Sequence, residues 1–189
     1  SQQINCQWTL MGQSLAPIAS SSGVVVQPWE TYRDPADFDY IVVVGGLLPE
    51  TLRGSQYLIN YLQRADRAHV PTIGLCTGSF AMIRAGLMKK RRCCVSWFHY
   101  KDLTERYADV VPVAEQLFVD DGDRITCAGG AVAADLAAYI IERHLGQSWA
   151  RKSLRILVMD SPRPANAPQP QPASDYQVNN TSVKRALLV

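Results

Sequence analysis

The chain of 189 residues lacks several features that would assign it to a class at once. No apolar run approaches the ~18 residues that a membrane-spanning helix needs, and no signal peptide is visible. The five cysteines are odd in number and include no Cys-x-x-Cys pair, so neither a disulfide framework nor a zinc site is expected. These absences predict a soluble, cytoplasmic protein without a metal, a cofactor or a membrane partner.

A strong charge of either sign is also missing, since the net charge is only +2. Residues 1–150 carry 13 Lys and Arg against 15 Asp and Glu, a balance of −2, whereas residues 151–189 carry 6 against 2, a balance of +4. The larger part is therefore not a basic nucleic-acid binder. The hydrophobic content of 47% is ample for one core.

What the sequence does contain is an alternation of apolar runs and helical patterns. Asp39–Gly46 and Val70–Leu75 are continuous apolar runs, typical of parallel strands covered on both faces. Further strands are expected at Gln7–Gly12, Val24–Val26, Cys93–Trp97, Leu117–Val119 and Arg124–Ala128, with loops at Pro17–Gly23 and Pro28–Asp39 and a hairpin turn at Asp120–Asp123. Helices are expected at Ser55–Ala68, Thr77–Ala85, His99–Tyr107, Ala131–Leu145 and Gln147–Met159. The pattern predicts an α/β fold, a three-layer sandwich around a mostly parallel sheet.

One heptapeptide, Ile73–Ser79, stands out because a cysteine lies where an apolar run turns into a helical pattern. A strand, a sharp turn and a helix in this order place Cys76 at the turn, in a strained backbone conformation, with the helix N-terminus favouring its thiolate. Three roles stay open from the residues alone: a catalytic nucleophile, a reactive but non-catalytic thiol, or an inert turn cysteine.

Three expected strand ends carry small residues, and ligands of such sheets bind at the carboxyl ends of strands. These ends are Gly45-Gly46, Cys76-Thr77-Gly78 and Ala128-Gly129-Gly130. We expect them to line one crevice. The two glycine pairs would either offer backbone N–H groups to a carboxylate or oxyanion, or simply form tight turns.

The composition changes from Ser161 onward, where five prolines fall within Ser161–Ser174. Residues 161–178 are expected to be an extended, semi-rigid linker that does not pack on the preceding domain. Asn179–Val189 has the pattern of a capped amphipathic helix that begins a second domain.

Three segments, Asp39–Gly46, Gly74–Gly78 and Leu117–Gly122, resemble the PfpI-like branch of the class I glutamine-amidotransferase superfamily. More closely, the chain resembles the N-terminal domain of GlxA-type regulators of the AraC family. The resemblance implies a flavodoxin-like fold with a nucleophile-elbow cysteine, in a sensor domain over residues 1–160 that lacks the family's first strand and helix. It further implies a homodimer, a small nitrogenous effector such as an amino acid or quaternary amine, and DNA contact only through a C-terminal helix-turn-helix domain that begins at residues 179–189.

Hydrolytic relatives of this kind carry a histidine where this chain has Ser96, which cannot serve as the acid for a leaving amine near neutral pH. The resemblance therefore implies a vestigial nucleophile and no enzyme, while a cysteine hydrolase or a glyoxalase- or deglycase-like enzyme remains the alternative. His99 would replace the missing histidine only if its loop folded back. The expected ligand-binding residues are Gly45, Gly46, Cys76, Thr77, Ser96, Trp97, Gly129 and Gly130.

Three other groups of side chains have two interpretations each. Trp29, Tyr32, Trp97 and Tyr100 would form a cationic-ligand cage or, as we favour, pack in the core and at its rim. Lys89–Arg92 would touch phosphates or, more plainly, form a solvated turn. His69 and His144 are expected to be structural or solvated.

Overall fold

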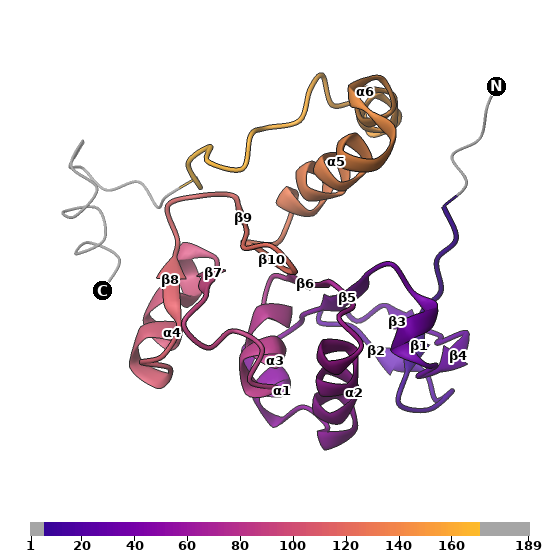
Figure 1. Ribbon diagram of the computed structural model, residues 1–189, viewed down its shortest axis with the longest axis vertical. Coiled ribbons are helices and arrows are strands. Elements are labelled where there is room, and N and C mark those ends of the chain that lie inside the picture. The colour runs from indigo at the N-terminus through magenta and orange to yellow at the C-terminus, as the bar shows by residue number, and fades with distance from the viewer. Residues whose placement is uncertain (1–5, 171–189) are drawn as a thin grey trace.

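The computed structural model describes residues 6–170 and is built around a four-stranded sheet (Figure 1). Its strand order is β5-β6-β10-β9, with β5 at Ile41–Val44, β6 at Thr72–Leu75, β10 at Arg124–Cys127 and β9 at Phe118–Asp120. The first three strands are parallel, and β9 pairs antiparallel with β10 across the expected hairpin. The mostly parallel sheet predicted from the apolar runs is confirmed.

Helices cover both faces of the sheet, which makes the three layers of the sandwich (Figure 1). One face holds α1 (Leu48–Arg53), α2 (Gln56–Arg67) and α3 (Gly78–Arg84), and the other holds α5 (Val132–Leu145), with α6 (Gln147–Ile156) packed on α5. The larger core, around Leu62, Phe80 and Met82, lies on the α2–α3 side. A second core, around Ile125 and Leu136, lies under α5.

The edge position of β5 corrects one expectation. Ile41 and Val43 are buried, but Val42 and Val44 on the opposite face are 49% and 72% exposed. An unbroken apolar run indicates a strand covered on both faces only when the layers of the fold extend past it. At this edge, the described chain covers one face.

The N-terminal part holds several short elements. β1 (Met11–Gly12), the remnant of the strand expected at Gln7–Gly12, pairs parallel with β4 (Glu30–Thr31), and η1 (Pro35–Asp37) follows. β2 (Ile18–Ala19) and β3 (Val25–Val26) form an antiparallel hairpin. β1 and β3 fall within the strands expected at Gln7–Gly12 and Val24–Val26, whereas β2, β4 and η1 lie where loops were expected. Strands of two residues such as β2 and β4 are too short to leave a periodic signal in a sequence.

The strand expected at Cys93–Trp97 is also shorter than predicted. β7 (Arg92–Cys94) pairs with β8 (Val111–Val113), a strand that the sequence analysis missed, and the 3-10 turn η2 (Trp97–His99) leads into α4 (Tyr100–Arg106). Ser96 caps the N-terminus of η2, because its hydroxyl accepts a hydrogen bond from the Phe98 N–H at 3.3 Å.

The proline-rich segment does not behave as a free linker over residues 163–169. Ala165 and Ala167 pack against the core under α5, and Gln169 is only 5% exposed. The expectation that this segment cannot pack is therefore wrong here. The helix expected at 179–189 lies outside the described residues. None of the helices within residues 6–170 has the length and apolar character that crossing a membrane requires.

The N-terminus of α3 lies so close to the end of β5 that side chains do not fit between them. A Cβ atom on Gly78 would stand 2.1 Å from the Val43 carbonyl oxygen, and one on Gly45 would stand 2.3 Å from the Gly78 nitrogen. Both contacts are with backbone, which cannot turn aside as a flexible side chain would. The two glycines are thus required by the approach of helix and strand.

Replacing Gly45 by alanine is expected to destabilise the fold by at least about 2 kcal/mol, since the methyl group overpacks a backbone contact. Gly46→Ala is the matched control, because a Cβ there meets nothing within 4 Å. Urea denaturation of both variants measures the difference in the free energy of unfolding. Equal stabilities of the two variants would contradict this account of the elbow.

Candidate functional site

Cys76 lies between β6 and α3 with a backbone φ of 54°. This left-handed conformation is unfavourable for a residue with a side chain and is retained only where the surroundings impose it. Here Ser79 helps to impose it, since its N–H and its hydroxyl both donate to the Cys76 carbonyl oxygen, at 3.3 and 2.9 Å. The strained strand-to-helix turn predicted for Cys76 is confirmed.

The half-buried Cys76 side chain borders a cleft of about 480 Å³. Its walls come from the elbow, from η2, from the loop between β10 and α5, and from the segment after α6. The lining residues are Cys76, Ser96, Trp97, Phe98, His99, Ala128, Gly129, Gly130, Ala131, Val132, Arg163, Gln169 and Pro170. The volume suits a small metabolite.

Five of the eight predicted binding residues meet at this cleft: Cys76, Ser96, Trp97, Gly129 and Gly130. Thr77 is fully buried instead, and its hydroxyl is bonded to both the N–H and the carbonyl of Gly46, at 2.9 and 2.8 Å. The Gly45 N–H donates to the Leu75 carbonyl. Gly45, Gly46 and Thr77 therefore act as a structural clamp behind the elbow, and the tight-turn interpretation holds for this glycine pair.

Gly129 allows the loop between β10 and α5 to close against the thiol. A Cβ on Gly129 would lie 2.5 Å from the Cys76 Cβ and 2.9 Å from its sulfur, and the Gly129 φ of 92° also disfavours any other residue. Among the described residues, none accepts a hydrogen bond from the N–H of Gly130 or Ala131. Both of these residues line the cleft together with Cys76.

The acid–base groups expected beside a catalytic thiol are absent from the described chain at hydrogen-bond distance. No side chain or backbone group within residues 6–170 forms a hydrogen bond with the Cys76 sulfur. His99 lines the same cleft, and its Nδ1 lies 3.3 Å from the Asp102 carboxylate. His99 is the last residue of η2, the turn that Ser96 caps, and this turn brings it to the cleft wall. From the sequence, His99 was expected near Cys76 only if its loop folded back.

The other described cysteines differ from Cys76 in their surroundings. Burial raises the pKa of the Cys93 thiol to about 12 and raises that of Cys94 well above its ordinary value. Burial also raises the pKa of Cys127, against the opposing effect of the Cys76 and Gly129 N–H groups. Cys6 is exposed. Buried thiols with raised pKa values stay protonated and unreactive near neutral pH.

The aromatic cage considered from the sequence does not assemble. Trp29 packs on Trp8 with ring centroids 4.6 Å apart, Tyr32 stacks on Tyr61 at 4.7 Å, and Tyr100 is buried in α4. Only Trp97 lines the cleft, where it meets Phe98 edge to face at 5.8 Å.

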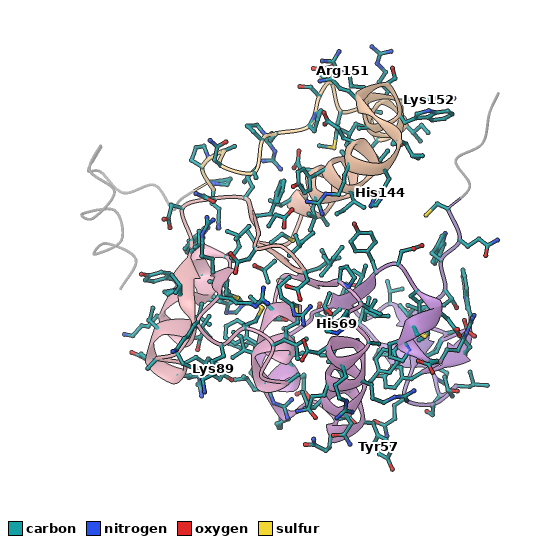
Figure 2. All side chains as sticks on the ribbon, in the orientation of Figure 1. Tyr57, His69, Lys89, His144, Arg151 and Lys152 are labelled. Carbon is teal, nitrogen blue, oxygen red and sulfur yellow. The ribbon has the colours of Figure 1, made fainter. Side chains whose placement is uncertain are left out.

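The basic and histidine candidates lie elsewhere in ordinary structural roles. Arg91 forms an ion pair with Asp123 at 2.7 Å, and Lys89 lies on the surface of the turn before β7 (Figure 2). His144 projects from α5, with its ring nitrogen 2.8 Å from the Tyr40 hydroxyl (Figure 2). Residues 6–170 hold no group of three or more His, Cys, Asp or Glu side chains placed to bind a metal ion.

A flavodoxin-like sheet with a cysteine in a left-handed conformation at the strand-to-helix turn is the arrangement expected of PfpI-like domains. The family comparison gives the same class. The family model described as DJ-1/PfpI family matches residues 2–143, and the chain belongs to that family. The resemblance inferred from the three motifs is thereby confirmed.

Individual relatives include both regulators and an enzyme. The HTH-type transcriptional regulator CdhR of Pseudomonas aeruginosa is 30% identical over 96% of this chain and 54% of its own length, and the regulator GlxA of Rhizobium meliloti is 28% identical over 71% and 41%. The isonitrile hydratase of Pseudomonas putida is 28% identical over 75% and 61%. The chain thus spans about half the length of the curated relatives it matches.

The solved structures give the same fold. The crystal structure of an AraC family transcriptional regulator from Pseudomonas putida superposes with a TM-score of 0.68 at 22% identity, over 80% of each chain. At this identity the match establishes the arrangement of strands and helices and leaves the chemistry of the cleft to be argued from its own residues.

Cys76 is expected to be alkylated by iodoacetamide at pH 7 well before Cys93, Cys94 and Cys127, because those three are buried and their raised pKa values disfavour the reactive thiolate. Peptide mapping by mass spectrometry on a Cys6→Ser background measures the rates without the exposed thiol. Labelling of Cys94 ahead of Cys76 would refute this order.

Proposed function

We propose that this chain is the ligand-sensing and dimerisation domain of a transcriptional regulator, with its effector bound in the cleft beside Cys76. The observation that carries the proposal is an elbow cysteine in an open cleft whose sulfur has no hydrogen-bonded base within the described residues. A cleft in which no acid or base is hydrogen-bonded to the thiol is better suited to binding than to turnover. The similarity to the regulators CdhR and GlxA supports the same conclusion.

The composition of the cleft supports a zwitterionic nitrogen compound, an amino acid or a quaternary amine with a carboxylate, as the effector. The N–H of Gly130 has no acceptor among the described residues and is available to a carboxylate, and the lining includes no Asp or Glu. The indole of Trp97 offers a face to an alkylated ammonium group. Both ends of such a molecule therefore find a matching group in the cleft.

A thermal-shift screen of amino acids, polyamines and quaternary amines tests the sensor. A true effector at 100 times its dissociation constant is expected to add about 2.7 kcal/mol of stability. Trp97→Ala should remove most of this gain if the effector is a quaternary amine, while Trp8→Ala, at an exposed ring outside the cleft, should leave it intact. A panel without any stabilising compound, or equal gains in both variants, would count against the assigned effector class.

A cysteine hydrolase or a glyoxalase- or deglycase-like enzyme is the second candidate, and one observation favours it. His99, oriented by Asp102, lines the same cleft as Cys76, and the chain is similar to an isonitrile hydratase. We expect no turnover of glutamine, methylglyoxal or an isonitrile. Activity that is present in the chain and lost in Cys76→Ser would establish the enzyme and exclude the sensor.

DNA contact is proposed to lie outside the described residues, in a helix-turn-helix domain that residues 179–189 begin, and the sensor domain is proposed to pair as a symmetric homodimer. Residues 1–150, with their balance of −2, are expected to bind no DNA specifically. A mobility-shift assay compares this chain with one extended past Val189, and only the extended chain should bind paired half-sites. Nanomolar, sequence-specific binding by this chain, or a monomeric mass in light scattering, would contradict these assignments.

A further inference from the structure

The segment after α6 is attached to the domain by a regular alternation of inward and outward residues. Over residues 163–170, here called the strap, the side chains at 163, 165, 167 and 169 are half-buried or buried, whereas those at 164, 166, 168 and 170 are exposed. Three of the four exposed positions are prolines, which have no N–H to satisfy. The strap therefore has one face built for contact with the domain.

Gln169 is the principal attachment point of the strap. Its amide nitrogen donates to the carbonyl oxygens of Val95 and Gln116, at 2.9 and 2.7 Å, and its amide oxygen accepts the Trp97 N–H at 3.0 Å. All of these partners are backbone groups around the cleft, and the two carbonyl acceptors fix the orientation of the amide. One buried side chain thus joins the strap to η2 and to the segment before β9.

Two further contacts hold the strap. Arg163 forms a two-pronged ion pair with Asp135 of α5, whose carboxylate is fully buried, and its backbone N–H donates to the same carboxylate at 2.8 Å. The Leu117 N–H donates to the Ala165 carbonyl at 3.0 Å. The hydrogen bond to Leu117 is useful as a reporter, because that amide is protected only while the strap is docked.

The strap is also a wall of the cleft, since Arg163, Gln169 and Pro170 line it together with Cys76 and Trp97. We propose that the strap is a movable wall of this site, so that a molecule in the cleft stabilises the docked strap and a released strap opens the cleft. Any occupant that contacts both the elbow and the strap binds the docked form more tightly, and docking and occupancy are then coupled reciprocally.

The proposal rests on the proposed function only for the identity of the natural occupant. In a regulator, the strap is the part of the chain that leaves the sensor toward residues 171–189. Whether the strap is docked would then depend on whether the cleft is occupied, and the position of the chain that leaves the strap would depend on it too. The coupling itself is a property of the cleft and the strap, and it can be measured without knowing the effector.

Gln169→Glu is the decisive variant, because it keeps the size of the side chain while turning a carboxylate toward two carbonyl oxygens. Gln147→Glu adds the same charge at an exposed position on α6 and is the control. On a Cys6→Ser background, hydrogen exchange at the Leu117 amide measures docking, and alkylation of Cys76 by iodoacetamide measures access to the cleft. Gln169→Glu is expected to speed both hydrogen exchange at Leu117 and alkylation of Cys76 by about fivefold or more, whereas Gln147→Glu should change neither rate.

The reverse direction is measured on the chain with Gln169 intact. Iodoacetamide leaves a carbamidomethyl group on the Cys76 sulfur, inside the cleft, as the thiolate displaces iodide. This occupant is expected to slow exchange at Leu117 at least about twofold. Unchanged or faster exchange at Leu117 after alkylation would overturn the proposal. So would a Gln169→Glu variant in which exchange at Leu117 does not speed up, or speeds up while the rate of Cys76 alkylation stays the same.

The intact chain decides the question if Gln169→Glu does not fold. If the thermal-shift screen finds no stabilising compound, the assignment of the effector class fails, but the coupling between the strap and the cleft can still be measured. Loss of the coupling would leave an effector found by the screen unaffected, so the two results are distinguishable.

Discussion

The close approach of α3 to the ends of β5 and β6 is the constraint on which the rest of the site depends. Gly45 and Gly78 leave no space for side chains between strand and helix, and Thr77 closes the gap by bonding to Gly46. With the helix held there, the chain must turn within Cys76, which explains its left-handed backbone. The direction of the thiol, and the location of the cleft, follow from that turn.

The loop after β10 completes the site through a second close approach, at Gly129. Because no side chain separates this loop from Cys76, the N-terminus of α5 and the elbow border the same space. The β10–β6 register, with Cys127 opposite Leu75, brings the two strand ends level. Parallel pairing therefore positions the cleft walls as well as the core.

The sequence predicted the sheet, the elbow and the hairpin because each leaves a local signal. β6 is a compact apolar run, Cys76 interrupts the change from strand to helix, and the turn at Asp120–Asp123 is rich in turn-forming residues. The two glycine pairs illustrate the limit of such signals. Gly45-Gly46 and Gly129-Gly130 have the same sequence, but the first pair is hydrogen-bonded within the clamp and the second borders the cleft. The difference arises from their tertiary neighbours, which a local sequence pattern does not reveal.

The docked strap could not be predicted for the same reason. Its prolines indicate an extended linker, and Arg163 and Gln169 carry no signal of burial. Their attachment depends on the Asp135 carboxylate and on the carbonyl groups of Val95 and Gln116, which are distant along the chain. The position of His99 could not be predicted either, because it reaches the cleft wall through the turn η2, which Ser96 caps.

The elbow also separates the shape of this site from its chemistry. The turn at Cys76 is fixed by backbone contacts and by the hydroxyls of Thr77 and Ser79, and none of these bonds involves the sulfur. A lineage can therefore exchange the sulfur, or the groups around it, and inherit the same receptor geometry unchanged. The similarity of this chain both to a transcriptional regulator and to an isonitrile hydratase is consistent with one scaffold serving different chemistries.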